Sequence, residues 1–455
     1  MSYKFDPFAL SEFALHYGFH YSRIDTEVLV ADAIAEMERG LKGEKSSLPM
    51  IPAYISPVSR IIPGKTVIAL DAGGTNLRSA LVSFDENGKA VTGESRRAPM
   101  PGTQGRLSAD AFFDGIADVT APLIEAAHGN PRRKIEGIGF CFSYNMEITK
   151  ETDGILRAFS KEIDVPEVLG RVIGSGLRDA LARRKVAAPE KIVLLNDTVA
   201  TLLSGLAELP ANDFRVEDRC GTEAGPVIGF ILGTGFNTAY PEKCIPKIGF
   251  DNPASPQIVV CESGNFAHRY MGELDREFDS GTKTPGTYTL EKAASGAYLG
   301  PLYFHILSRA IRDGVISFNR QDEFLSRPVL STKELNAFLH EPFAQAGAVG
   351  GLFGKDERGA LTAFVYIASI VVERAALLSA SLVAAAAEKA AGQNHDPLAP
   401  VRVAVEGTTF MVFKGMRKAI EAHLHAILNR KKPRSCIIAP VEQASLFGAA
   451  VAALS

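Results

Sequence analysis

Two segments of the chain share one pattern, an apolar run followed by glycines with Thr and Asn and then by a second apolar run. They are residues 67–83 (VIALDAGGTNLRSALVS) and residues 227–240 (VIGFILGTGFNTAY). Each pattern predicts a β-hairpin with a glycine turn that exposes backbone N–H groups. Such N–H groups can bind phosphate oxygens, because no side chain blocks their approach. Two turns of this kind predict a clamp that holds a nucleotide from two sides.

The first glycine turn, residues 71–76 (DAGGTN), differs from a P-loop. It lacks the Gly-Lys-Ser/Thr ending and leads into a predicted strand instead of a helix. Taken alone, it could equally be an ordinary glycine β-turn. Its pairing with a second turn, residues 233–235, favours phosphate binding. Asp71 stands at the end of the preceding strand, where a carboxylate can hold Mg²⁺ or its shell of water.

Carboxylates also stand at the junctions between predicted elements. Asp197 follows a buried strand and starts a helix, where it could simply cap the helix. A carboxylate in a cleft can also act as the base in phosphoryl transfer, because the loose transition state demands little activation of the nucleophile. Glu262 closes a strand and Glu291 lies near a helix start, where acidic residues are common. Together with Asn237, these two carboxylates would form an acceptor set for the hydroxyls of a polyol.

The segments between these motifs alternate between strand and helix patterns. Helices are predicted over residues 26–41, 109–127 and 443–454, and strands over residues 135–144 and 401–405. This alternation, in two halves that each carry one glycine hairpin, predicts an α/β fold. The cleft between two such halves is where a ligand is expected to bind.

The longest apolar region, residues 360–387, is interrupted by Glu373 and Arg374. This interruption favours a long buried helix over a membrane span. The first residues, MSYKFDPFALSEF, carry acidic side chains and lack the apolar core of a signal peptide. We therefore expect a cytoplasmic protein.

The composition is typical of a soluble globular protein. The chain has 455 residues, of which 46% are hydrophobic and 22% charged, and this length corresponds to about three domains of ordinary size. The net charge of −3 gives no overall attraction to nucleic acid or to an anionic membrane. The five cysteines include no CxxC pair, so neither a zinc site nor a disulfide framework is indicated.

Seven ordered segments together resemble the eukaryotic-type hexokinase/glucokinase family, within the actin-like ATPase superfamily. They are LDAGGTNLR, FSY with the following GIL and FSK, LLNDTVATLL, LGTGFNTAY, the strand that ends at Glu262, TPGTYTLEKAASGAYLG and the closing FGAAVAALS. The resemblance runs from Ser47 almost to the C-terminus. It implies a two-lobed actin-like ATPase (ribonuclease H-like) fold with a cleft and a hinge. The expected small lobe is residues 66–196, with residues 436–455 crossing back to it, and the expected large lobe is residues 1–65 and 197–435.

The resemblance also implies roles for individual residues. Asp197 matches the catalytic base on the sugar 6-hydroxyl, and Lys161 matches a catalytic lysine that contacts the sugar and offsets charge at the transferred phosphoryl group. The other residues that match sugar ligands are Ser160, Asn196, Asn237, Glu262 and Glu291. The residues that match the nucleotide site are Gly73, Gly74, Thr75, Asn76, Arg78, Gly233, Thr234, Gly407 and Thr408, with Asp71 on the metal side.

The sequence departs from the family pattern at two places. After FSY, the family's Pro-x-Ser-Gln is replaced by residues 145–148 (NMEI), so that Glu147 stands where a serine contacts the sugar. In the segment near the nucleotide, two expected glycines are replaced by Ala444 and Leu446. The first departure bears on the choice of sugar, and the second on the contacts with adenine.

The sequence is thus interpreted as that of an ATP- and Mg²⁺-dependent hexokinase that phosphorylates glucose, and related hexoses, at the 6-hydroxyl after sugar-induced closure of its lobes. The expected partners are small molecules, a hexose and ATP, with no nucleic acid and no membrane, and the protein is expected to be a monomer or a homodimer. One alternative is a kinase of the same superfamily for mannose, fructose or an amino sugar, with Glu147 as its main support. Another is a sugar sensor that has lost catalysis.

Overall fold

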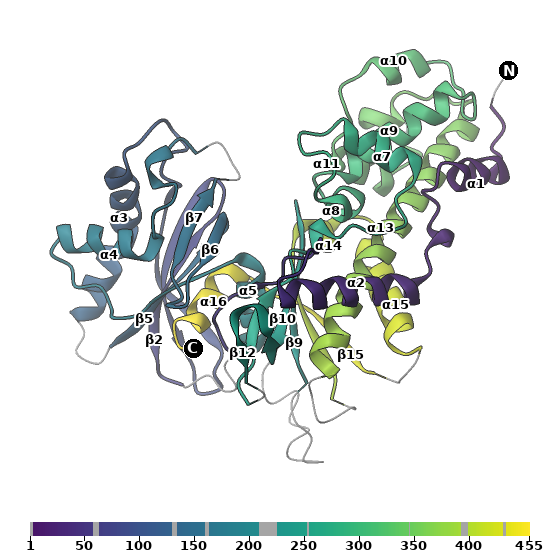
Figure 1. Ribbon diagram of the computed structural model, residues 1–455. Helices are drawn as coiled ribbons and strands as arrows, with labels where there is room; N and C mark the ends of the chain where they lie inside the picture. The colour runs from purple at the N-terminus through teal and green to yellow at the C-terminus, as the bar shows by residue number, and fades with distance from the viewer. Residues whose placement is uncertain are drawn as a thin grey trace.

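Two mixed β-sheets form the centre of the structure, and helices cover them (Figure 1). The computed structural model describes residues 3–57, 63–129, 134–159, 163–208, 225–252, 254–344, 346–392, 399–430 and 434–455. The first sheet has five strands in the order β4-β3-β2-β5-β8, and the second has six in the order β1-β13-β10-β9-β14-β15. We call the parts built on these sheets the small lobe and the large lobe.

The strands of the small lobe are β2 (Thr66–Ala72), β3 (Asn76–Phe84), β4 (Ala90–Pro99), β5 (Ile135–Phe142) and β8 (Ile192–Leu195), with a separate hairpin of β6 (Asn145–Ile148) and β7 (Gly154–Ala158). The strands of the large lobe are β1 (Ile51–Pro52), β9 (Val227–Leu232), β10 (Phe236–Glu242), β13 (Gln257–Val260), β14 (Val401–Glu406) and β15 (Cys436–Pro440), with a short pair of β11 (Cys244–Ile245) and β12 (Phe250–Asp251).

The two sheets repeat one arrangement of strands. In the small lobe, β2 pairs antiparallel with β3 and parallel with β5, which in turn pairs parallel with β8. In the large lobe, β9 pairs antiparallel with β10 and parallel with β14, which in turn pairs parallel with β15. Both predicted glycine hairpins therefore occupy equivalent positions, β2–β3 in one lobe and β9–β10 in the other.

The helices of the small lobe are α3 (Ala109–His128) and α4 (Ile173–Arg183), which pack on the outer side of its sheet (Figure 1). Those of the large lobe are α1 (Pro7–His16), α2 (Thr26–Lys42), α7 (Glu273–Ser280), α8 (Thr289–Ala294), α9 (Leu299–Arg312), α10 (Gln321–Ser326), α11 (Thr332–His340), α12 (Gly347–Gly350), α13 (Arg358–Gly392), α14 (Thr408–Val412) and α15 (Met416–Leu428). The expected helices 26–41 and 109–127 are confirmed as α2 and α3.

Two further helices, α5 (Asp197–Glu208) and α16 (Ala444–Ala452), lie between the sheets (Figure 1). They pack so closely that a Cβ on Gly448 would lie 2.0 Å from the carbonyl oxygen of Ala200. They share a buried apolar core with strands of both sheets. The segment 436–455 contributes β15 to the large sheet and α16 to this junction. The expected lobe boundaries themselves stay a prediction.

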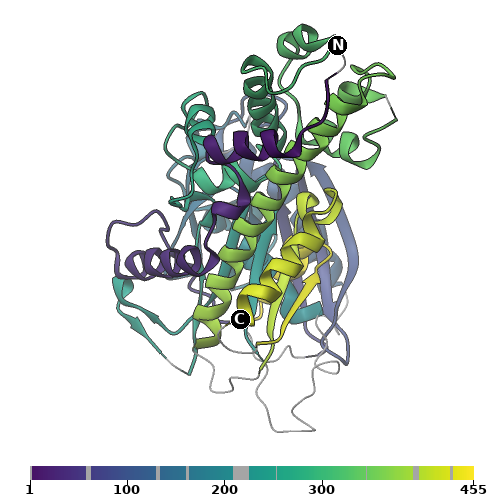
Figure 2. The same cartoon turned by 90° about the vertical axis from the view of Figure 1, so that its right-hand side faces the viewer.

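Helix α13 is the long buried helix that the sequence predicts. It runs along the large lobe beside α15, as Figure 2 shows. It is long enough to cross a membrane, and an 18-residue stretch of it has a mean hydropathy of 1.8, but 72% of that stretch is buried inside the protein. The charge of Arg374 within it is paired with Asp275 of α7 through two hydrogen bonds of 2.8 Å each. The helix is therefore part of a packed core.

Candidate active site

A cleft of about 490 Å³ lies between the ends of strands from both lobes. Its polar lining includes five residues that the sequence analysis assigned to sugar binding: Asn196, Asp197, Asn237, Glu262 and Glu291. They come from widely separated parts of the chain, namely the start of α5, the strand β10, the end of β13 and helix α8. The fold thus brings together a set of carboxylates and amides that sequence alone could only suggest.

The junction between β8 and α5 leaves the carboxylate of Asp197 facing the cleft. The helix cap comes from the preceding residue, because Asn196 Oδ1 accepts a hydrogen bond of 2.7 Å from the backbone N–H of Thr198. This is the usual role of an N-cap side chain. The Thr198 hydroxyl lies 3.3 Å from Asp197 Oδ1. Asp197 is therefore a cleft residue, and the capping role that its position also allowed belongs to Asn196.

Glu262 follows β13 with a left-handed backbone, φ 56°. Its Oε1 accepts a hydrogen bond of 3.0 Å from the side-chain amide of Asn237. Burial above all, against the lowering effect of the hydrogen bond from the Asn237 amide and with the charges of Asp197 and Glu291 adding to it, raises the pKa of Glu262 to about 7. Without a ligand, the ionised form of Glu262 is thus destabilised by its surroundings. A ligand that donates hydrogen bonds to the carboxylate would stabilise the ionised form.

Glu291 approaches the site from helix α8. Its Oε2 accepts a hydrogen bond of 3.0 Å from the backbone N–H of Phe236, directly after the second glycine turn. A Cβ on Gly235 would lie 2.9 Å from this oxygen, so the absence of a side chain there permits the contact. Burial raises the pKa of Glu291, whereas the Phe236 N–H and the charge of Lys292 lower it.

The first glycine turn joins β2 and β3. The N–H of Gly73 donates to the carbonyl of Asn76 over 3.0 Å, and the Tyr144 hydroxyl donates to the carbonyl of Gly73 over 2.6 Å. Thr75 and Asn76 are exposed at the tip, as a phosphate-binding turn requires. Arg78 is half-buried on the following strand.

The buried thiol of Cys141 on β5 lies near three carboxylates. Asp71 is its register partner on β2. Burial raises the pKa of Cys141 well above its ordinary value, and the charges of Asp71, Asp197 and Glu406 add to this increase. Asp71 from the first turn, the cleft residue Asp197 and Glu406 from the end of β14 are thus all near enough for their charges to act on this thiol.

The second glycine turn joins β9 and β10 and is closed by a bond of 3.0 Å from the N–H of Gly233 to the carbonyl of Gly235. Its Gly233 carbonyl also accepts the Thr409 hydroxyl over 2.8 Å. Gly407 has φ +127°, and a Cβ there would lie 2.3 Å from the carbonyl carbon of Leu232. The segment after β14 is thus packed directly against the second turn, with Thr408 exposed. Four of the predicted nucleotide residues therefore stand together, namely Gly233, Thr234, Gly407 and Thr408.

Residues 14–207 match one model of the hexokinase family, and residues 227–455 match a second. The chain belongs to the hexokinase family. It is 30% identical over 448 residues to hexokinase-1 of Schizosaccharomyces pombe, an alignment that covers 94% of this chain and 87% of the relative. It is 28% identical over 447 residues to hexokinase-2 of Solanum tuberosum, with coverage of 94% and 87%. The enzyme class predicted from the sequence is therefore confirmed.

The fold of this hexokinase is likewise shared with solved structures. The hexokinase of Schistosoma mansoni complexed with glucose matches 99% of this chain and 100% of its own, with a TM-score of 0.75 and 24% sequence identity. A second hexokinase crystal structure has the same TM-score, 0.75, and 22% identity. The predicted two-lobed actin-like ATPase fold is thereby confirmed.

The first departure from the family pattern, Glu147, points away from the cleft of this hexokinase. Its neighbours Met146 and Ile148 line the cleft, and successive side chains of a strand alternate between faces. The Glu147 side chain is 60% exposed and forms an ion pair with Arg157 of β7. The charged side chain is therefore not part of the cleft lining.

The second departure is absorbed by packing. Ala444 and Leu446 are buried in the apolar core that joins the two lobes of the hexokinase. They contribute to the contact between α16 and α5. Two other predicted residues, Ser160 and Lys161, lie outside the described residues.

The cleft also contains polar residues that sequence reasoning missed. Asn265 lies one turn after Glu262, and its side-chain amide is 3.4 Å from the Glu262 carbonyl. Tyr288 precedes α8 with φ 53° and lines the cleft while 39% exposed. Their nearness in sequence to Glu262 and Glu291 was the available signal. No single pattern distinguishes such residues from ordinary loop residues, which is why they were not selected.

Proposed function

We propose that this hexokinase transfers the terminal phosphoryl group of ATP to the 6-hydroxyl of glucose, with Asp197 as the base. The observation that carries the proposal is that Asp197 shares one cleft with Asn237, Glu262 and Glu291. Sugar hydroxyls can donate hydrogen bonds, and the carboxylates of Asp197, Glu262 and Glu291 are acceptors. A site of buried acceptors favours a ligand that pairs with all of them and rejects one that leaves them unpaired.

The position of Asp197 suits it to proton abstraction. Phosphoryl transfer needs a positioned carboxylate more than a strong base, because the transition state is loose. Asp197 would accept the proton of the attacking hydroxyl, while Asn196, Asn237, Glu262 and Glu291 hold the sugar in place. The family resemblance assigns to Lys161 the task of offsetting charge on the transferred phosphoryl group. Ser160 would add a further contact with the sugar.

The two glycine turns would hold the phosphates of ATP. Their tips, Thr75–Asn76 in the small lobe and Thr234 in the large lobe, are exposed, and Gly407–Thr408 stand beside the second turn. Mg²⁺, when bound, would neutralise phosphate charge. Asp71 fits it as a ligand through water, because Mg²⁺ keeps most of its water shell and uses one or two carboxylates with substrate phosphates.

Closure of the lobes gives the reaction its selectivity against water. Water carries a hydroxyl too, and an open site would hydrolyse ATP. If sugar binding drives closure, the catalytic groups assemble only when the correct acceptor is present. The cleft lies between the lobes, where such a movement would enclose the sugar.

Glucose is favoured over the alternative sugars by the direction of Glu147. That residue was the main reason to consider mannose, fructose or an amino sugar, and it pairs with Arg157 outside the cleft. We also propose a cytoplasmic enzyme that acts on small molecules as a monomer or homodimer, consistent with its net charge of −3.

The test is release of ADP from Mg·ATP with glucose, mannose, fructose, glucosamine or N-acetylglucosamine, and with no sugar as the control. We expect turnover that depends on sugar and is fastest, by kcat/KM, with glucose. Preference for another sugar would overturn the assignment of glucose but leave the enzyme class intact. Equal ATP hydrolysis with and without every sugar would overturn the proposed mechanism.

A further inference from the structure

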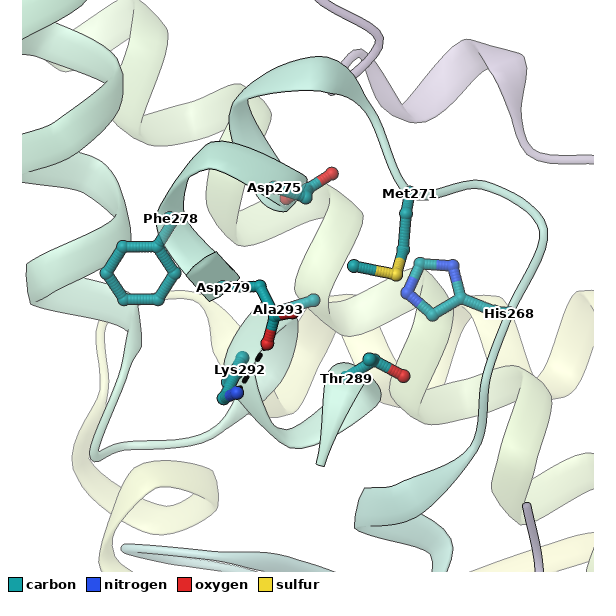
Figure 3. A pocket seen from close by; sticks show the side chains of 8 residues that line it. All are labelled: His268, Met271, Asp275, Phe278, Asp279, Thr289, Lys292 and Ala293. Atoms are coloured by element: carbon teal, nitrogen blue, oxygen red, sulfur yellow. Dashed lines mark hydrogen bonds and ion pairs between the residues drawn. The ribbon is translucent and has the colours of Figure 1, made fainter. Parts of the chain in front are cut away.

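Figure 3 shows a small cavity of about 10 Å³ that helix α8 lines together with α7. The same helix also lines the cleft. Tyr288 and Glu291 line the cleft, whereas Thr289, Lys292 and Ala293 line the cavity. One short helix thus presents a proposed sugar ligand on one side and a buried lysine on the other.

Helix α8 and the residues that directly follow it form three hydrogen bonds with the second glycine turn and the residue after it. Glu291 accepts the Phe236 N–H over 3.0 Å. Just after the helix, the N–H groups of Gly296 and Ala297 donate to the carbonyls of Gly233 and Thr234 over 2.8 and 3.0 Å. A displacement of α8 would therefore move both the sugar carboxylate and the turn proposed to bind phosphate.

A helix as short as α8 has little stability of its own, so contacts with the rest of the protein set its position. On the cavity side, the Thr289 hydroxyl donates to the carbonyl of Phe266 over 2.8 Å, and Lys292 makes the ionic contact. Its side chain is 4% exposed and forms an ion pair with Asp279 of α7, drawn as a dashed line in Figure 3. Its Nζ also donates to the carbonyl of Thr284 over 2.6 Å. Asp279 in turn accepts the Gly286 N–H over 2.8 Å, which ties the preceding loop to the same point.

The other ionisable residues of the cavity do not substitute for this ion pair. Within the described part of the chain, neither ring nitrogen of His268 has a hydrogen-bond partner, and burial lowers the pKa of His268 to about 4. It is therefore neutral near neutral pH. Asp275 is paired with Arg374 of α13 instead of with α8. The Lys292–Asp279 pair thus provides the ionic contact between α7 and α8.

We propose that Lys292, held by Asp279, is a positioning residue that sets Glu291 and the second glycine turn as one unit. Loss of the Lys292–Asp279 ion pair would weaken the binding of both the sugar and ATP, although neither Lys292 nor Asp279 lines the cleft. The inference rests on the proposed role of Glu291 in binding sugar. It adds a residue on the far side of α8 to the determinants of both KM values.

The structure offers a matched pair of variants on α7. Asp279→Asn and Asp275→Asn each keep the shape of the side chain and each leave a buried cation without its carboxylate, Lys292 in one case and Arg374 in the other. We expect both to lower Tm. Only Asp279→Asn should raise the KM values for glucose and for ATP, each by about tenfold, because only it releases α8. Lys292→Gln should reproduce the effect on both KM values.

The outcomes separate the alternatives. Unchanged KM values in Asp279→Asn and Lys292→Gln, with Tm lowered, would show a purely structural pair and overturn the proposal. If Asp275→Asn raises both KM values as much as Asp279→Asn does, the effect is a general loosening of the structure and the proposal is overturned. An increase in the KM of only one substrate in Asp279→Asn would also overturn it. Glu291→Gln tests the underlying assignment. If its KM for glucose is unchanged, the proposed sugar role of Glu291 fails. If that KM rises while the Asp279 and Lys292 variants behave normally, only the positioning role fails.

Discussion

The side-chain amide of Asn237 is held in one orientation beside Glu262. Its nitrogen donates to Glu262 Oε1 over 3.0 Å, while its oxygen accepts the N–H groups of Thr238 and Ser263 over 2.8 and 3.2 Å. The two backbone donors fix which end of the amide faces the carboxylate. Glu262 is thereby pre-oriented, as its proposed role in accepting a sugar hydroxyl requires.

This arrangement predicts that Glu262 lowers the stability of the folded protein at neutral pH, although it is proposed to bind the sugar. Unfolded, its carboxyl ionises near the ordinary pKa of 4.5, whereas burial raises the pKa in the folded protein to about 7. Between these pH values the folded state binds the extra proton, so raising the pH favours unfolding. Glu262→Gln removes this titration. The variant should gain about 3 kcal/mol in unfolding free energy relative to the parent as pH rises through this window.

The measurement is urea unfolding of both proteins, without sugar, at the two ends of the window. The same variant should lose affinity for glucose, because it replaces an acceptor by an amide. Parallel pH dependences for variant and parent would show that Glu262 is ionised at its ordinary pKa in the folded protein.

Asp197→Asn tests the base directly. The amide keeps the shape of the side chain but cannot accept the proton of the sugar hydroxyl, so turnover should fall by about a thousandfold. The dissociation constant of glucose, measured by calorimetry without nucleotide, should stay within about tenfold of the parent value. Near-normal turnover would assign the base to another group. If the variant no longer binds glucose and its Tm is also lowered, Asp197 has a structural role at the start of α5 instead.

The sequence predicted the repeated hairpins, because glycine turns between apolar strands are local signals. It also predicted α13 as a buried helix from its apolar length, but not the partner of Arg374. That partner, Asp275, lies on another helix, and such pairing depends on tertiary packing. The prediction that Asp197 and Glu291 lie in one site likewise required the family resemblance, since no local pattern connects residues so far apart in the chain.

Two details depended on geometry that sequence does not specify. At the start of α5, Asn196 and Asp197 are both good capping residues, and only the backbone determines which one caps the helix. At Glu147, a shift of strand phase by one residue would exchange the cleft face for the solvent face. The sequence alone therefore could not decide whether Glu147 affects the choice of sugar, because only the structure shows in which direction its side chain points.

Glu147→Ser provides a test of that direction. Because Glu147 faces Arg157 and not the cleft, the KM for glucose and the ranking of sugars should stay within about twofold of the parent. Both side chains are exposed, so loss of their ion pair should change the unfolding free energy by less than about 1 kcal/mol. Arg157→Ser is the matched control and should behave alike. A reordered preference among the hexoses in Glu147→Ser alone would show that the carboxylate reaches the sugar.

Gly407→Ala should impair the nucleotide site selectively. A methyl group there would meet the Leu232 carbonyl carbon at 2.3 Å and the Gly233 nitrogen at 2.6 Å, and the φ of +127° disfavours any side chain. The second glycine turn must therefore shift, and the KM for ATP should rise by about tenfold or more. Gly314→Ala is the control, because Gly314 also has positive φ, +72°, but no atom within 4 Å of the added carbon. It should cost about 1 kcal/mol of stability and leave both KM values unchanged. If both variants lose stability equally and the KM for ATP is unchanged in each, the second turn does not bind the phosphates and the nucleotide must be held elsewhere in the cleft.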